Sequence, residues 1–132
     1  FINRMMVDGK KSISESIAYG AIEILKNKVS RANDLELFEE AVEKAMPAVE
    51  VKSRRVGGAT FPVPIEVPPG RAEALSMSWI IEGARGRKER TMSERLAAEI
   101  LDAIEGRGYA VKKKDEMHRM ADANKAFSHY RW

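Results

Sequence analysis

Apolar residues recur at helical spacing through most of the chain and at every second position in one central segment. The helical pattern is clear where Ile13, Ile17, Ala21 and Ile24 fall three or four residues apart. Such a stripe is typical of a helix that packs one face on a core. The same pattern predicts six helices along the chain, near residues 1–6, 12–28, 33–46, 69–86, 91–105 and 115–129.

Residue types that start or stop helices bound several of these segments. Ser12 with Glu15, and Thr91 with Glu94, have the spacing of capping boxes. Pro47 stops the third helix because proline cannot continue the backbone hydrogen bonds. The remaining caps that we expect are Asn33 or Asp34 for the third helix and Asp115 for the last.

The alternating segment, residues 49–67, predicts a β-hairpin. Its odd positions are largely apolar on both sides of a Gly57-Gly58 pair, which is typical of two antiparallel strands joined by a tight turn. Pro62 and Pro64 remove two N–H groups on the same edge and so block a further strand there. The predicted fold class is mainly α: a six-helix bundle with one inserted two-stranded β-hairpin arm, in a single domain of residues 1–132.

The length of the hairpin loop decides which residues share a face, because directly opposed residues lie on the same side of the ribbon. A two-residue loop at 57–58 would pair Val51 with Pro64 and mix the apolar and polar sets. A three-residue loop at 57–59 would pair Val51 with Ile65 and keep the apolar sets together. We therefore expect the odd-length loop or a bulge with the same effect.

Composition excludes several classes of site. The chain has no cysteine, so it has no disulfide, thiolate metal site or cysteine nucleophile. No apolar run approaches the roughly 20 residues of a membrane-spanning helix, so no membrane partner is expected. The sequence begins at Phe1 rather than at methionine, inside a predicted helix, and we expect the natural protein to have a further N-terminal segment.

Charge is dense but nearly balanced, with 23 Lys and Arg against 20 Asp and Glu, so its distribution matters more than its sum. The predicted helix 33–46 is strongly acidic and should face away from a polyanion. The basic residues gather at turns and helix ends, where long side chains can converge on one ligand. The candidates for polyanion contact are Lys10, Lys11, Lys52, Arg54, Arg55, Arg71, Arg85, Arg87, Lys88, Arg90, Arg107, Lys112, Lys113 and Lys114.

Each of these signals also has a plain structural explanation. The hairpin arginines can protect a strand edge from aggregation, the lysines at 112–114 can be a solvated run, and Trp79 fits a core position of its helix. His118 and His129 have no cysteine or paired carboxylate at ligand spacing, so no metal site is expected. Because no nucleophile–base pair is found, we expect neither an enzyme nor a cofactor.

Several long segments resemble one protein family. They are VEVKSRRVGGAT (49–60), MSERLAAEILDA (92–103), AVKKKDEMHRMADANKAF (110–127) and SHYRW (128–132), with DGKKS (8–12) as a shorter match. They resemble ribosomal protein seven of the small subunit, in its bacterial or organellar form, over essentially the whole chain. The resemblance implies a six-helix protein with a β-ribbon arm that performs no chemistry.

The resemblance also implies a place in the cell and a set of partners. The protein would bind the 3′ major domain of small-subunit ribosomal RNA, nucleate assembly of the subunit head, and lie beside exit-site tRNA and mRNA. Its neighbours would be small-subunit proteins nine and eleven, in a cytoplasmic or organellar ribosome. The hairpin tip, Gly57 and Gly58, would point toward the exit site. Arg119 and Arg131 join the basic residues above as implied RNA contacts.

One segment departs from the family pattern. Family members carry a basic stretch after the second strand, whereas residues 67–72 read VPPGRA and leave Arg71 alone. From the residues alone, the alternative function is a duplex DNA-binding helical module with a wing-like hairpin. Cations scattered over several loops favour irregular RNA, because DNA readers concentrate base-reading side chains on one helix.

Overall fold

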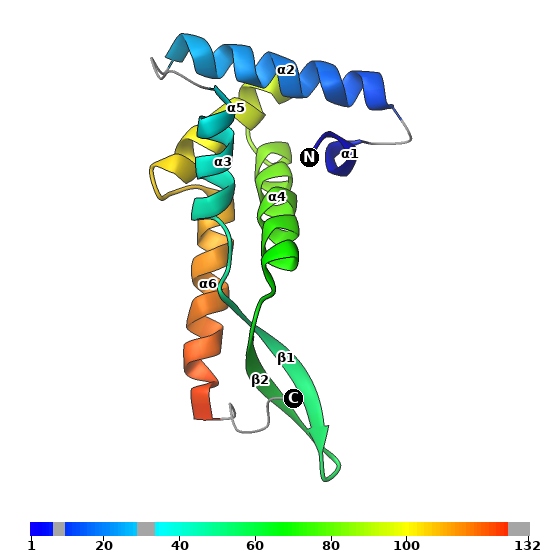
Figure 1. The fold of residues 1–132 in the computed structure, drawn as a ribbon, viewed down its shortest axis with the longest axis vertical. Helices are drawn as coiled ribbons and strands as arrows, with labels where there is room; N and C mark the ends of the chain where they lie inside the picture. The colour runs from blue at the N-terminus through cyan, green and yellow to red at the C-terminus, as the bar shows by residue number, and fades with distance from the viewer. Residues whose placement is uncertain (7–9, 29–33, 127–132) are drawn as a thin grey trace.

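The computed structural model of the protein describes residues 1–6, 10–28 and 34–126 (Figure 1). Within these residues the predicted mainly helical fold with one hairpin is confirmed. Helices are found at all six predicted places in this part of the chain. The first of them, α1, is a single turn of four residues, and the other five are longer helices. The elements are α1 (Ile2–Met5), α2 (Lys11–Lys28), α3 (Asp34–Lys44), β1 (Val49–Val56), β2 (Ala59–Glu66), α4 (Pro69–Arg85), α5 (Met92–Ile104) and α6 (Tyr109–Ala123).

The molecule is elongated, with α2 lying across one end and the ribbon of β1 and β2 extending toward the other (Figure 1). The helix α5 is central, because it contacts α2, α3, α4 and α6. Its buried face is formed by Leu96, Ala97, Ile100 and Ala103, which recur at the spacing of one helical stripe. Trp79 of α4 belongs to the same core, as its place on an apolar stripe predicts.

Of the two capping boxes predicted from the sequence, one is present in the structure. Thr91 caps α5, since its Oγ1 accepts a hydrogen bond from the Glu94 backbone N–H at 3.2 Å. The prediction that Ser12 caps α2 is wrong, because the helix already includes Lys11 and Ser12. Asn33, the other expected cap of α3, lies outside the described residues, and Asp34 is the first residue of that helix.

The last helix starts well before the predicted Asp115, which lies inside it. Gly108 has φ 98° and ψ 174°, a conformation that is essentially restricted to glycine. The carboxylate of Glu99, on α5, then accepts a hydrogen bond from the Ala110 backbone N–H at 3.1 Å. A side chain from another helix therefore caps α6, and no local pattern reveals such a cap.

The hairpin has the two-residue-loop register, which the alternation of apolar and polar side chains did not favour. Val56 opposes Ala59 and Val51 opposes Pro64, so the loop has two residues, Gly57 and Gly58. Their φ angles are 57° and 83°, and two consecutive positive φ angles are what a tight two-residue hairpin turn requires. The expectation of a three-residue loop is therefore wrong, because the backbone freedom of the glycine pair outweighs the parity of the side chains.

This register changes the faces of the ribbon. Arg54, expected on a polar face, opposes Phe61 and is half-buried, whereas Arg55 is exposed. On the face that holds Arg54, Glu50 is 4% exposed and Val63 is fully buried. A buried carboxylate in the ribbon needs a cationic partner, and this partner comes from α4.

The base of the ribbon is held by α4 and α6. His118 of α6 accepts a hydrogen bond at Nε2 from the Ala48 backbone N–H at 3.0 Å. This contact gives His118 a structural role. Within the described ranges, no helix has the length and apolar character that a bilayer crossing requires.

Candidate nucleic-acid interface

The basic residues proposed from the sequence divide into two groups. In the first group, carboxylates or carbonyl groups of the protein itself engage the cation. In the second group, the side chain is exposed or half-exposed and makes no ion pair with another described residue. This second group is Lys10, Lys11, Arg55, Lys88, Arg90, Lys112, Lys114 and Arg119.

Arg71 belongs to the engaged group. Its Nε lies 2.7 Å from Oε2 of Glu50 and its Nη2 lies 3.2 Å from Oε1, so the guanidinium binds the carboxylate with two parallel hydrogen bonds. The hydrogen bond to Glu50 raises the pKa of Arg71. Lys52 is 4.0 Å from the same carboxylate. Arg71, left alone in VPPGRA, therefore joins α4 to β1 and holds the ribbon.

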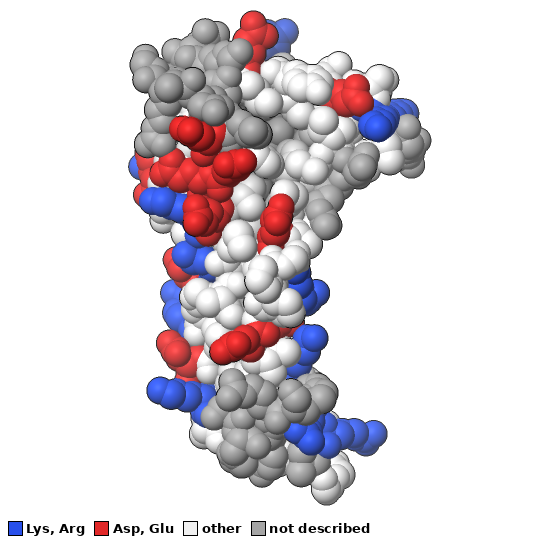
Figure 2. All heavy atoms as spheres, in the orientation of Figure 1, with Lys and Arg blue, Asp and Glu red and all other residues white. Residues whose placement is uncertain are grey.

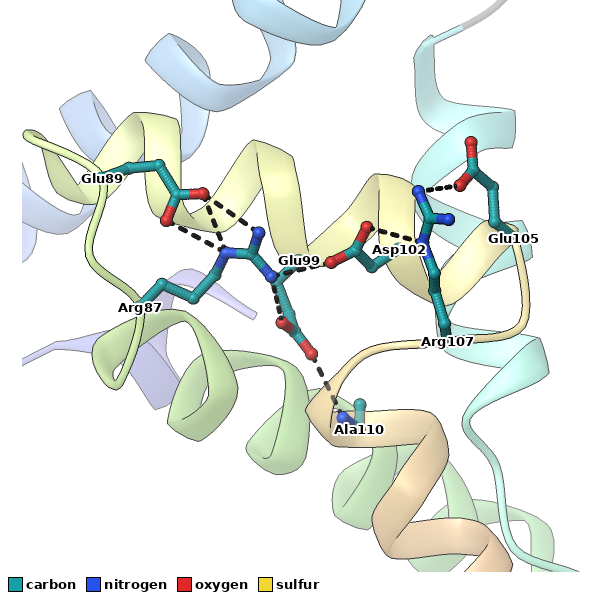
Figure 3. Close-up of polar contacts among 7 residues, drawn as sticks. All are labelled: Arg87, Glu89, Glu99, Asp102, Glu105, Arg107 and Ala110. Carbon is teal, nitrogen blue, oxygen red and sulfur yellow. Dashed lines mark hydrogen bonds and ion pairs between the residues drawn. The ribbon is translucent and has the colours of Figure 1, made fainter.

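Arg87, between α4 and α5, is surrounded by three carboxylates (Figure 3). Its Nε donates to Glu89 at 3.1 Å, and its Nη1 donates to Glu99 at 3.2 Å and to Asp102 at 2.8 Å. The hydrogen bond to Glu89 is the largest cause of the raised pKa of Arg87, and it lowers the pKa of Glu89 in return. The donors of Arg87 are thus used within the protein.

Glu99 is the centre of this network, and the sequence argument missed it. It is 1% exposed, and it accepts hydrogen bonds from both Arg87 and the backbone of Ala110. Gly83 of α4 permits this approach, because a Cβ there would lie 2.8 Å from the Glu99 carboxylate. The signal in the sequence was a charged residue at a core position beside Ile100, on an otherwise apolar stripe.

Further predicted contacts also have partners within the protein. Arg107 bonds to Asp102 at 3.2 Å and pairs with Glu105. Arg85 donates to the Met5 carbonyl at 3.2 Å, and the Lys113 ammonium lies 5.6 Å from the centre of the Tyr109 ring. Burial is the largest cause of the raised pKa of Tyr109, and a hydrogen bond with Glu82 is the second.

Two further predicted contacts have other outcomes. Arg54 interacts with another group within the protein, and Arg131 lies outside the described residues.

The unengaged cations come from separate parts of the fold. Lys10 and Lys11 lie at the start of α2, Lys88 and Arg90 precede α5, Arg55 is near the ribbon tip, and α6 carries the rest. Gly57 and Gly58 at the tip are exposed, and a Cβ at either would meet nothing within 4 Å. Acidic side chains gather over α3 on the face shown in Figure 2, and the region of the ribbon carries basic ones. The arrangement suits a ligand with many dispersed phosphates.

Comparisons with known proteins identify the family of the chain. The family model described as "Ribosomal protein S7p/S5e" matches residues 1–125. The chain is 61% identical over 132 residues to the small ribosomal subunit protein uS7 of Francisella philomiragia subsp. philomiragia, and the match covers 84% of that protein. It is 60% identical, with the same coverage, to the protein of that name from Francisella tularensis subsp. novicida. Neither comparison supports the duplex-DNA alternative. Because the match spans nearly the whole chain, the protein belongs to the ribosomal protein S7p/S5e family.

Proposed function

We propose that the protein is a structural constituent of the small ribosomal subunit, holds ribosomal RNA through phosphate contacts, and performs no chemistry. The observation that carries the proposal is the set of unengaged cations on α2, α6, the ribbon and the loop before α5. The names of the bacterial relatives, all small ribosomal subunit proteins, support it. As part of a bacterial-type ribosome, the protein would act in the cytoplasm.

The division of the cations assigns different tasks to the two groups. A free ammonium or guanidinium can neutralise a phosphate and release its counterion. An engaged cation such as Arg87 or Arg71 would first have to leave a carboxylate that is buried, and an unpaired buried carboxylate is strongly destabilising. The unengaged group therefore supplies the phosphate contacts, while the engaged arginines hold the helices and the ribbon in place.

The finer assignment rests on the family relationship. The RNA would be the 3′ major domain, the protein would nucleate assembly of the subunit head, and small-subunit proteins nine and eleven would be its neighbours. Exit-site tRNA and mRNA would pass near the ribbon. The uncovered glycine tip supports this last point, since bare backbone allows close approach of a nucleic acid. Residues 1–132 would act as one RNA-binding domain.

The experiment compares unengaged with engaged cations. We expect Lys112→Ala with Lys114→Ala to reduce the slope of log affinity against log salt by about 2 for a fragment of the 3′ major domain. Removing Arg107, an exposed but engaged cation, provides the matched control: Arg107→Ala should leave the slope unchanged. Competition with duplex DNA tests the alternative. Equal slopes for the lysine double variant and the Arg107 variant would contradict the proposal.

Arg55 offers a second test in the ribbon. Because Arg54 is half-buried opposite Phe61, its removal would perturb the protein itself, whereas Arg55 is exposed. Arg55→Ala alone should weaken RNA binding and change the free energy of unfolding by about 0.5 kcal/mol or less. Unchanged RNA affinity would show that the ribbon tip is not an RNA contact.

A further inference from the structure

A groove of about 320 Å³ lies between α3 and α4, away from the cations discussed above. Its floor includes Phe38, Met46 and Met77, which are half-buried and pack on the core with part of their apolar surface still accessible. Three exposed glutamates line the groove around this floor: Glu39, Glu43 and Glu73. The groove therefore combines an apolar floor with an anionic rim.

Among the described residues, Glu39, Glu43 and Glu73 make no ion pair. Glu39 and Glu43 are four residues apart on one helix, a spacing at which like charges repel. Further acidic side chains gather over α3 (Figure 2). A cation that approached this rim would relieve the repulsion.

The two properties together restrict the occupant. RNA is repelled by the carboxylates. A simple cation or a polyamine would pair with the carboxylates but would leave the apolar floor of the groove exposed to water. Apolar surface rimmed by polar groups marks protein interaction sites, and methionine side chains adapt their shape to a partner. Charge complementarity thus selects a cationic polypeptide that also carries an apolar side chain.

We propose that this groove docks a basic segment of another protein in the same particle. An apolar side chain of the segment enters the floor, and its flanking Lys or Arg side chains pair with Glu39, Glu43 and Glu73. The inference rests on the proposed function only in placing the protein within the ribosomal subunit. It adds a protein-binding face that is separate from the cations assigned to RNA.

The chain has no cysteine, so a single introduced cysteine can carry a photo-reactive cross-linker. Glu73→Cys places it on the rim, and Glu94→Cys places it at an exposed position on α5 as a control. Small subunits are assembled with each labelled protein, irradiated, and analysed by mass spectrometry. We expect Glu73→Cys to cross-link to a protein segment that is rich in Lys and Arg and contains an apolar side chain, with no such product from Glu94→Cys.

A charge test then separates docking from mere proximity. In the Glu73→Cys background, Glu39→Gln with Glu43→Gln should reduce the cross-link yield roughly fivefold, as expected for the loss of two exposed ion pairs. The matched control, Glu23→Gln with Glu94→Gln, removes two exposed carboxylates elsewhere and should leave the yield unchanged. The thermal midpoint of the glutamine variants checks that folding is intact.

In the cross-linking experiment, the inference would be overturned by cross-links to RNA, to a second copy of this chain or to an uncharged segment, or by no product above the Glu94→Cys control. In the charge test, it would be overturned by a cross-link yield that the two α3 substitutions do not change. Incorporation of the labelled protein into the subunit is measured in the same samples. A protein that incorporates but gives no basic cross-link refutes the groove and leaves the RNA-binding proposal intact. If the unlabelled wild-type protein does not incorporate either, the proposed function is refuted.

Discussion

The buried carboxylate of Glu99 should be among the most sensitive side chains of the protein. It is 1% exposed and holds three elements together, by accepting hydrogen bonds from Arg87 before α5 and from the N-terminus of α6. In Glu99→Ala, the Ala110 N–H loses its partner, which costs about 1–3 kcal/mol for a buried donor. Arg87 loses one of its three carboxylate partners but keeps Glu89 and Asp102. The destabilisation from the lost Arg87–Glu99 pair is therefore smaller than the roughly 3–5 kcal/mol expected when a buried ion pair is fully broken.

Together these losses amount to about 2–4 kcal/mol of unfolding free energy. For a chain of 132 residues, each kcal/mol corresponds to roughly 3–4 °C in the thermal midpoint, so Glu99→Ala should lower the midpoint by roughly 10 °C. Glu99→Gln keeps an oxygen for Ala110 but removes the charge that Arg87 binds, and it should cost about 1–2 kcal/mol. The order of stability should therefore be wild type, then the glutamine variant, then the alanine variant.

Thermal unfolding followed by circular dichroism measures these midpoints. Glu105→Ala is the matched control, because Glu105 also pairs with an arginine but its side chain is 53% exposed. An exposed pair contributes about 1 kcal/mol or less. If the midpoint of Glu99→Ala is no lower than that of Glu105→Ala, the carboxylate of Glu99 does not hold α5 and α6 together and the reasoning fails.

Three further changes test other parts of the fold. Gly108→Ala should destabilise by about 1–3 kcal/mol in urea unfolding, because φ is 98° and a Cβ would lie 3.0 Å from Asp102, whereas Gly70→Ala, with open space around it, should not. Thr91→Ala should cost about 1 kcal/mol by loss of the α5 cap, and an unchanged urea midpoint would contradict this. The lowered pKa of Glu89 means that its contribution to stability is complete above its ordinary value of 4.5 and is lost as pH falls through the lower folded-state pKa. Glu89→Gln should therefore make the fall of the thermal midpoint below pH 4.5 shallower, and a curve parallel to wild type would argue against the Arg87–Glu89 pair.

The sequence predicted those elements whose signals are local. Periodicity gave the helices, and the Thr91 cap and the Pro69–Gly86 boundaries of α4 followed from residues at the helix ends. At Ser12 a local signal failed, because α2 begins one residue earlier, at Lys11. Elsewhere the prediction failed where a distant residue intervened. α6 begins at Tyr109 because Glu99, ten residues earlier on another helix, caps it. The hairpin register failed for a different reason, since two local preferences conflicted and the backbone of Gly57-Gly58 prevailed over side-chain parity.

The candidate site shows the same division. Composition and position identified the basic residues, but they could not distinguish Arg87, held by three carboxylates, from Lys88, which makes no ion pair among the described residues. That distinction depends on Glu99 and Asp102, which lie 12 and 15 residues further along the chain. Spacing of this kind carries no periodic signal, so only the folded arrangement reveals which cations are available.

This arrangement also explains how a nearly neutral chain can present itself to a polyanion. The formal net charge is only +3, and a uniform mixture of charges would attract RNA weakly. The acidic residues, however, are used in two places. Some are turned inward onto arginines that fix the helices, as Glu50 and Glu99 are, and others are gathered on α3. The cations that remain outside make no ion pair with a described residue, although exposed carboxylates such as Asp115 and Glu116 lie beside them on α6. Screening limits the reach of the carboxylates on α3, because the Debye length is about 8 Å at physiological salt. Moving carboxylates from α3 to the surface around Lys112 and Lys114 would leave the net charge unchanged. On this reasoning, it should weaken RNA binding about as much as removing these two lysines does.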